Sequence, residues 1–317
     1  MKNILVTDIG GTNSRFAHFV VNKSGKLSIV NSQWFETAKF TSFKQLLEQL
    51  SMIEFSLLPE EADIVVIAIA GPVEEGIYCA PPFISWDIII SNALKDYGFK
   101  KSFLINDFVA QAFACRSPLA ESAEIILNGK IRLTAPVAIL GAGTALGMAT
   151  LVSDGRDGFV ALPSEGGHTN FPFTSRRECE FQEFLLQELG EPYLTANHIV
   201  SGRGLSYIHR FLTGEILEPN EVTSKLHINS ETLIWAARFY GRTCRNYALG
   251  NLARGGIYVV GGVAAKSPAL LTHNAFKTEF YCSKTMAHIL KDIPLFLIRN
   301  EESGLWGAAF FGLQHLN

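Results

Sequence analysis

The segment that most constrains the fold is a glycine-rich turn at residues 8–15, with the sequence DIGGTNSR. It joins two short apolar runs, residues 4–7 and 16–21, which have the composition of buried strands. Two strands joined through Asp-x-Gly-Gly-Thr form a tight hairpin, and the glycines allow a ligand to approach the backbone closely. We therefore expect a β-hairpin whose turn faces a ligand.

The chemistry of this turn suits a phosphate and a metal ion. Exposed backbone N–H groups in such a turn form an anion-binding nest, and Thr12, Asn13 and Ser14 add side-chain donors. Asp8, at the end of the first strand, suits a hydrated Mg²⁺ ion, which takes one or two carboxylates and keeps several waters. An ordinary hairpin turn uses the same residue types, so both interpretations stay open for this segment alone.

The composition argues against several classes of protein. With 317 residues, 48% of them hydrophobic and 18% charged, the chain can bury a large core, and disorder is not expected. The net charge of -3 gives no attraction to nucleic acid or to a membrane surface. The five scattered cysteines form no C-x-x-C pair, which argues against disulfides and cysteine-rich zinc sites and favours a cytoplasmic protein.

A stretch without charged residues, residues 133–153, is long enough to span a bilayer. However, Pro136 and several glycines interrupt it, and threonines are interspersed. Two buried strands around a glycine-rich turn explain the stretch better than a membrane helix does. A signal peptide is not expected either, because Asp8 interrupts the first apolar run.

The order of strands and helices predicts an α/β protein with two halves. Strands are expected at residues 3–7, 14–21, 27–34, 64–70, 102–105, 137–140, 146–152, 257–260 and 294–298. Helices are expected at residues 42–52, 85–97, 108–115, 177–189, 204–212, 230–253 and 304–316. Each half opens with a hairpin around a Gly/Thr turn, and no linker rich in Pro, Gly or Ser separates the halves.

A second glycine-rich turn, residues 141–147 with the sequence GAGTALG, resembles the first in chemistry but has no acid. Its backbone and the Thr144 hydroxyl are candidates for cradling phosphates, with a plain hairpin turn as the alternative. The pattern matches neither the dinucleotide fingerprint nor the P-loop. Farther along, Gly261 and Gly262 end a buried strand, where a flat ring or a phosphate can lie against the backbone. A simple strand-to-helix turn is the alternative there.

Two further segments carry polar side chains that suit catalysis or sugar binding. Asn106 and Asp107 follow a buried strand and precede a helix. Either can cap the helix, and a carboxylate there can also act as a general base beside an amide that orients a hydroxyl. Glu165 and His168, separated by two glycines, suit neighbouring sugar hydroxyls. A structural histidine with satisfied hydrogen bonds is the alternative for His168.

Taken together and in this order, these segments resemble the bacterial glucokinase family of the sugar kinase/actin/Hsp70 superfamily. The resemblance runs from Asp8 to the final apolar helix, and it is carried by residues 8–15, 105–108, 141–144, 162–168, 201–205 and 261–262. It implies phosphorylation of the 6-hydroxyl of glucose by ATP with Mg²⁺. It also implies an α/β, two-domain actin-like ATPase (ribonuclease H-like) sugar kinase fold with an interdomain cleft. The implied domains are a small one, residues 1–107 plus 303–317, and a large one, residues 108–302.

The resemblance also implies a role for each candidate residue. Asp107 matches the family's general base, and Asp8 would face the hydrated Mg²⁺ through water. The residues implied to bind the substrate are Asn106, Asp107, Glu165, His168, Asn197 and Gly143. The residues implied to bind ATP are Asp8, Gly10, Gly11, Thr12, Asn13, Arg15, Gly141, Gly143, Thr144, Gly261 and Gly262.

The chain departs from the family pattern in three places. Asn197 stands where the family usually has a sugar-binding Glu, and an amide cannot act as a charged acceptor. The segment 82–86, PFISW, lacks the Thr-Asn that family members often carry before this Trp. The chain also lacks the cysteine-rich zinc motif and the N-terminal DNA-binding region of the related repressor/kinase group, which favours a plain kinase.

Asn197 and Phe83 keep a second hypothesis open, a kinase for another hexose or for an amino sugar. A third hypothesis is a catalytically weak sugar sensor of the same fold, although Asp8 and Asp107 favour an enzyme. The sequence does not decide between ATP and polyphosphate as the phosphate donor. The expected partners are glucose or a related hexose, ATP, and a second copy of the chain. The apolar helices are the only support for this homodimer.

Overall fold

A computed structural model describes residues 1–316, which divide into two compact units. The first unit comprises Met1–Glu121 and the C-terminal segment that begins at Glu302, and the second unit comprises Ser122–Glu301. Residues 108–121 thus lie in the first unit, whereas the implied domain boundary assigned them to the second. The physical reason is that helix α3 (Asp107–Ala114) packs against helix α13 (Ser303–Gln314).

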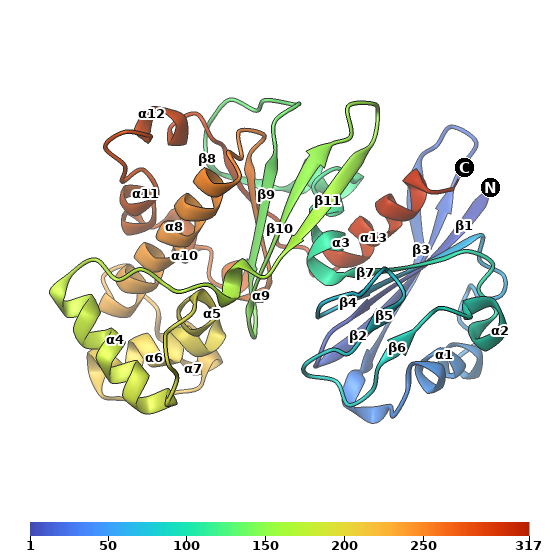
Figure 1. Ribbon diagram of the computed structural model, residues 1–317, viewed down its shortest axis with the longest axis horizontal. Helices are drawn as coiled ribbons and strands as arrows, with labels where there is room; N and C mark the ends of the chain where they lie inside the picture. The colour runs from blue at the N-terminus through green and yellow to red at the C-terminus, as the bar shows by residue number, and fades with distance from the viewer. Residues whose placement is uncertain (317) are drawn as a thin grey trace. The chain divides into compact units, whose positions relative to one another are not determined.

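The first unit is built on a five-stranded sheet with the order β3-β2-β1-β4-β7. Its strands are β1 (Lys2–Ile9), β2 (Asn13–Val21), β3 (Leu27–Glu36), β4 (Ile64–Ile69) and β7 (Ser102–Asn106). The first three form antiparallel hairpins, and β4 and β7 run parallel to β1. Helices α13 and α3 cover one face of the sheet (Figure 1).

Helix α1 (Phe43–Met52) covers the other face of this sheet. Its apolar residues recur at helical spacing, so Phe43, Leu46, Leu47 and Leu50 are buried together. Ser42 caps the helix by accepting a hydrogen bond from the Gln45 N–H. The smaller elements of the unit are η1 (Thr37–Lys39), β5 (Tyr78–Cys79), β6 (Ile88–Ile89), α2 (Ala93–Tyr97) and η2 (Pro118–Ser122).

The second unit repeats this topology in a six-stranded sheet with the order β11-β10-β9-β12-β13-β8. Its strands are β8 (Glu124–Leu127), β9 (Val137–Ala142), β10 (Leu146–Ser153), β11 (Phe159–Ser164), β12 (Ile257–Val260) and β13 (Leu295–Leu297). Strands β9, β10 and β11 form antiparallel hairpins, and β12 runs parallel to β9, as β4 does to β1. The predicted hairpin around a Gly/Thr turn is present in each unit, and in the second unit strand β8 precedes it.

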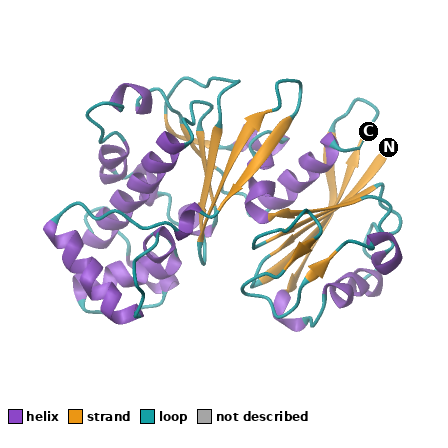
Figure 2. Cartoon of the chain, viewed as in Figure 1, coloured by secondary structure: helices purple, strands orange, loops and turns teal. Residues whose placement is uncertain are grey.

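The helices of the second unit are η3 (Gly166–His168), α4 (Arg176–Leu189), α5 (Ala196–Ile199), α6 (Gly202–Thr213), α7 (Pro219–Lys225), α8 (Glu231–Gly250), α9 (Gly262–Lys266), α10 (Ala269–Thr272), α11 (Asn274–Phe280) and α12 (Ala287–Leu290). Most of them lie on one side of the sheet (Figure 2). Helices α6, α10 and α11 pack against the long helix α8. The core of the second unit contains an ion cluster. The side chains of Glu178 on α4 and Arg242 on α8 are each 1% exposed and bind through contacts of 2.7 and 3.1 Å. Arg242 also binds Glu279 on α11 at 3.0 Å.

The expected helix at residues 85–97 is wrong in its first part. Residues 88 and 89 form strand β6, which pairs with β5, and the helix begins only at Ala93. Three consecutive isoleucines, residues 88–90, favour an extended backbone because their branched side chains crowd a helix. Strand β11, which contains Pro163, was not among the predicted strands. It lies at the edge of its sheet, where a proline costs no ladder hydrogen bond.

The uncharged stretch at residues 133–153 forms β9 and β10, as predicted. Across residues 1–316, no helix combines the length and the apolar character that crossing a bilayer requires.

Candidate functional site

In the first unit, Asp8 lies at the carboxyl end of β1, directly opposite Arg15 on β2. The Arg15 guanidinium is 3.2 Å from Asp8 Oδ2 and stacks 4.1 Å above the centre of the Trp34 ring. Burial raises the pKa of the Asp8 carboxyl, and the nearby Arg15 charge opposes that rise. The geometry therefore holds a carboxylate and a guanidinium in fixed positions beside the glycine-rich turn.

Two hydrogen bonds from Thr37, a residue that the sequence did not single out, hold the turn in place. The Thr37 hydroxyl donates to the Gly10 carbonyl at 2.7 Å, and the Thr37 N–H donates to the Thr12 carbonyl at 3.0 Å. Gly10 N–H also binds the Asn13 carbonyl at 2.9 Å, which closes the turn. Gly11 and Thr12 are exposed at its tip, as a backbone site for an anion requires.

Asn106 and Asp107 both contact the backbone at the start of α3. Asn106 caps α3, since its Oδ1 accepts from the Phe108 N–H at 2.9 Å, while its Nδ2 donates to the Gly71 carbonyl at 2.9 Å. Asp107 is the first residue of the helix and is half-buried, and its Oδ1 lies 3.0 Å from the same N–H. The carboxylate is thus fixed at the end of β7, where ligands bind in sheets of this kind.

Two more residues lie beside Asp8. Gly304, near the start of α13, is packed so closely that a Cβ there would be 2.7 Å from Asp8 Oδ2 and 3.2 Å from Gln111 Nε2. Gln111 lies on α3, and its buried Oε1 has no hydrogen-bond partner within residues 1–316. Gln111 follows Asp107 by four residues and so lies on the same face of α3. This spacing is the one feature of the sequence that could have indicated Gln111 as a site residue.

In the second unit, the two groups of predicted ATP-binding glycines lie side by side. Val260 pairs with Gly141 across the parallel strands β12 and β9, so Gly261 follows directly beside Ala142. Gly261 has a φ of 88°, and a Cβ there would be 2.7 Å from the Ala142 carbonyl oxygen. The strand-to-helix turn that the sequence offered as an alternative is present, and both glycine-rich backbones lie at the carboxyl ends of β9 and β12.

Glu165 precedes the short helix η3, His168 is its last residue, and both are exposed. Their side chains are 3.7 Å apart between Glu165 Oε2 and His168 Nε2. His168 is thus an exposed side chain whose ring lies beside the Glu165 carboxylate. The pair offers a donor and acceptors on one surface, as the recognition of adjacent hydroxyls requires.

Asn197, on α5, is half-buried and does not point freely into solvent. Its Oδ1 accepts a hydrogen bond of 2.8 Å from the Leu146 N–H, at the start of β10. This contact connects a predicted sugar-binding residue to the predicted phosphate turn at residues 141–147.

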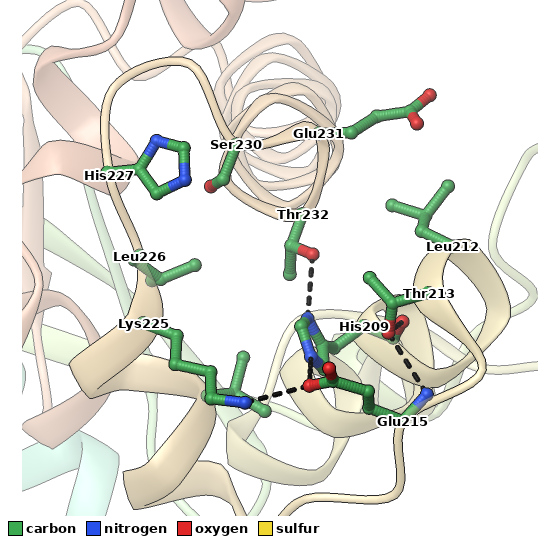
Figure 3. A pocket seen from close by; sticks show the side chains of 11 residues that line it. His209, Leu212, Thr213, Glu215, Lys225, Leu226, His227, Ser230, Glu231 and Thr232 are labelled. Carbon is green, nitrogen blue, oxygen red and sulfur yellow. Dashed lines mark hydrogen bonds and ion pairs between the residues drawn. The ribbon is translucent and has the colours of Figure 1, made fainter.

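A separate cavity of about 350 Å³ lies among α6, α7 and α8, and none of the predicted site residues lines it (Figure 3). His209 binds Thr232 Oγ1 through Nδ1 at 3.0 Å and Glu215 Oε2 through Nε2 at 3.3 Å. Lys225 Nζ is 2.8 Å from the same Glu215 oxygen. These four side chains satisfy one another, so we assign them a structural role.

Comparison with known proteins gives one consistent result. The family model described as Glucokinase matches residues 5–315. A glucokinase of Saccharophagus degradans is 32% identical over 320 residues, which cover 98% of each chain. Among solved structures, a glucokinase from an Antarctic psychrotroph has a TM-score of 0.83 at 24% identity, covering 99% of each chain. A Balamuthia mandrillaris glucokinase in complex with glucose has a TM-score of 0.81 at 22% identity, covering 99% of this chain and 94% of that one.

Proposed function

Because the chain belongs to the glucokinase family, we propose that it transfers the γ-phosphoryl group of ATP to the 6-hydroxyl of glucose. The products are ADP and glucose 6-phosphate. The observation that carries this proposal is the position of Asp107, a half-buried carboxylate at the head of α3, next to an Asn106 amide held by two hydrogen bonds. A general base needs this kind of fixed carboxylate within reach of a substrate hydroxyl.

In the proposed reaction, Asp107 accepts the proton of the 6-hydroxyl as that oxygen attacks the γ-phosphorus. Asn106, Glu165 and His168 are the residues proposed to bind sugar hydroxyls. Phosphoryl transfer depends on positioning and on neutralising charge more than on covalent chemistry, so these contacts supply much of the catalysis.

The proposed phosphate contacts come from backbone groups. They are provided by the turn with Gly10, Gly11, Thr12 and Asn13, and by the turn with Gly141, Gly143 and Thr144. Gly261 and Gly262 would lie against the adenosine. Arg15, fixed by Asp8 and Trp34, supplies a positive charge near the first turn. Oriented N–H groups and fixed cations stabilise developing phosphate charge without reorganising.

The surroundings of Asp8 fit a hydrated Mg²⁺ ion. Within residues 1–316, no cluster of three His, Cys, Asp or Glu side chains is able to hold a metal directly. A single carboxylate, with the amide of Gln111 beside it, instead suits an ion that keeps most of its waters. When bound with ATP, Mg²⁺ would neutralise charge on the phosphates. Asp8 and Gln111 would hold its water shell.

Gly304→Ala is expected to lower kcat/KM by roughly 10- to 100-fold, because the new methyl group would displace the Asp8 carboxylate, and small misplacements at such sites have effects of this size. The Mg²⁺ concentration needed for half-maximal rate should rise as well. Steady-state kinetics with Mg²⁺ titrations would measure both. Gly250→Ala is the matched control, since a Cβ there meets nothing within 4 Å. An unchanged Mg²⁺ requirement in Gly304→Ala would contradict the assignment of Asp8 to the metal.

A kinase for another hexose or an amino sugar is the second candidate function. It is favoured by Asn197, whose oxygen is engaged by Leu146, and by Phe83, which is exposed beside Gly11. ADP release measured across a panel of hexoses and amino sugars, with Mg²⁺-ATP and with polyphosphate, separates the candidates. We expect glucose with ATP to give the highest kcat/KM. A higher value for an amino sugar would reject glucose as the preferred substrate, and sugar binding without turnover would indicate a sensor.

The proposed setting is the cytoplasm, where the five unpaired cysteines of this chain would stay reduced. A homodimer is the proposed assembly. Analytical ultracentrifugation at micromolar concentration tests it directly.

A further inference from the structure

The tip of the second glycine-rich turn is anchored at both ends by one short segment of the chain, residues 197–202. At one end, the Gly143 carbonyl accepts from the Gly202 N–H at 2.9 Å. At the other, the Leu146 N–H donates to Asn197 Oδ1 at 2.8 Å. The Gly143 N–H closes the turn internally on the Ala145 carbonyl at 2.9 Å. The exposed Thr144 therefore sits on a loop whose two ends are fixed from outside.

The segment that carries Glu165 and His168 meets the same point. Gly167, between them, is buried, and a Cβ there would lie 2.2 Å from the Leu146 carbonyl oxygen and 2.6 Å from Asn197 Oδ1. No side chain fits at Gly167, so its backbone packs directly on the Leu146–Asn197 contact. The turn, the Glu165–His168 segment and α5 thus share one junction inside the second unit.

Asn197 is itself held in place for this contact. The Thr195 and His198 side chains form a capping box at the start of α5, and the Ala196 N–H donates to the Thr169 carbonyl at 3.1 Å. The Leu146 N–H needs Asn197 Oδ1 as its acceptor, because a buried backbone N–H without a hydrogen-bond partner destabilises the fold. Leu146 is buried, and its N–H lies at the end of the ladder between β9 and β10.

We propose that Asn197 is a positioning residue that holds the turn at residues 143–146 and the Glu165–His168 segment in register. The proposal rests on the proposed function, in which the turn faces the ATP phosphates and the segment binds the sugar. It changes the role that the family resemblance implies for Asn197, because its oxygen already accepts from the backbone. The Nδ2 group and the second lone pair of the oxygen are left for a sugar. One side chain then affects the affinity for both substrates.

The test compares Asn197→Ala, which removes the acceptor, with Asn197→Asp, which keeps an oxygen for the Leu146 N–H. Two readouts are measured: amide hydrogen exchange at Leu146 in the ligand-free protein, and separate KM values for ATP and glucose. Asn246→Ala, an exposed asparagine on α8, is the matched control. Asn197→Ser, whose side chain is too short to reach Leu146, replaces the alanine variant if that variant does not fold.

In Asn197→Ala we expect faster exchange at Leu146 and both KM values raised, each by roughly three- to tenfold, the scale of one hydrogen bond. Asn197→Asp should keep the slow exchange and the KM for ATP, while the KM for glucose changes. A variant without the acceptor that raises only the KM for glucose, with exchange unchanged, would overturn the proposal. So would loss of protection in Asn197→Asp. If the wild-type protein has no kinase activity, the proposed function fails, and the exchange data still decide whether the junction exists.

Discussion

Asp107→Asn is expected to reduce kcat by about 10²-fold or more, the effect of removing a positioned general base. Asparagine has nearly the same size and can still accept from the Phe108 N–H, as Asp107 Oδ1 does at 3.0 Å, so the start of α3 should persist. The KM for ATP should change little. Coupled ADP-release kinetics measure the rate, and circular dichroism checks the fold.

Asp96→Asn is the control for this experiment, because Asp96 is an exposed carboxylate in the same unit. It should leave the rate unchanged. Calorimetry should show that Asp107→Asn still binds glucose and nucleotide. A folded Asp107→Asn protein that turns over near the wild-type rate would remove Asp107 from the role of base.

Glu178→Gln is expected to destabilise the second unit by about 3–5 kcal/mol, because it leaves a buried arginine with an incomplete set of partners. Glu178 binds Arg242 through two contacts and also accepts from the Thr174 N–H at 2.8 Å. Urea unfolding followed by tryptophan fluorescence measures the loss. Glu180→Gln, on the same helix, is the control: its pair with Arg176 is exposed and should be worth less than about 1 kcal/mol.

The same pair predicts a dependence of stability on pH. Burial raises the pKa of Glu178, but hydrogen bonds from Arg242 and Thr174 outweigh burial and hold it below the ordinary value. A carboxyl with a lowered pKa adds stability above its unfolded-state pKa and loses it as the pH falls through the folded-state pKa. The difference in stability between wild type and Glu178→Gln should therefore shrink below about pH 4. A difference that stays constant down to pH 2 would contradict this role.

The elements that the sequence predicted well are those set by local pattern. Both hairpins, the buried strands and the long helices follow from apolar spacing and glycine-rich turns, which depend on neighbouring residues. The ends of strands β1, β7, β9 and β12 were predictable in the same way, and so were the polar residues placed there. The predicted helix at residues 85–97 went wrong where strand pairing between β5 and β6 overrode helical spacing.

The parts of the site that the sequence did not reveal depend on contacts between distant residues. Thr37 supports a turn 27 residues away, and Gly304 meets Asp8 from the far end of the chain. Leu146, the partner of Asn197, is 51 residues from it. A residue type alone could not tell whether the oxygen of Asn197 serves a sugar or the backbone. That distinction depends on the packing of Gly167 against Leu146 and Asn197, which only the structure shows.

The first unit takes its strands from the start of the sequence and one of its covering helices, α13, from the end. Gly312 of α13 packs on Ile4 and Val66, and Gly304 packs on Asp8. During synthesis, residues 1–121 leave the ribosome first, and the second unit, which is continuous in sequence, can then fold as a whole. The apolar face under α13 must wait until residues 303–314 have emerged. The first unit, whose strands are translated before the second unit, is therefore completed only after residues 122–301 have been made, and Gly304 reaches Asp8 only then.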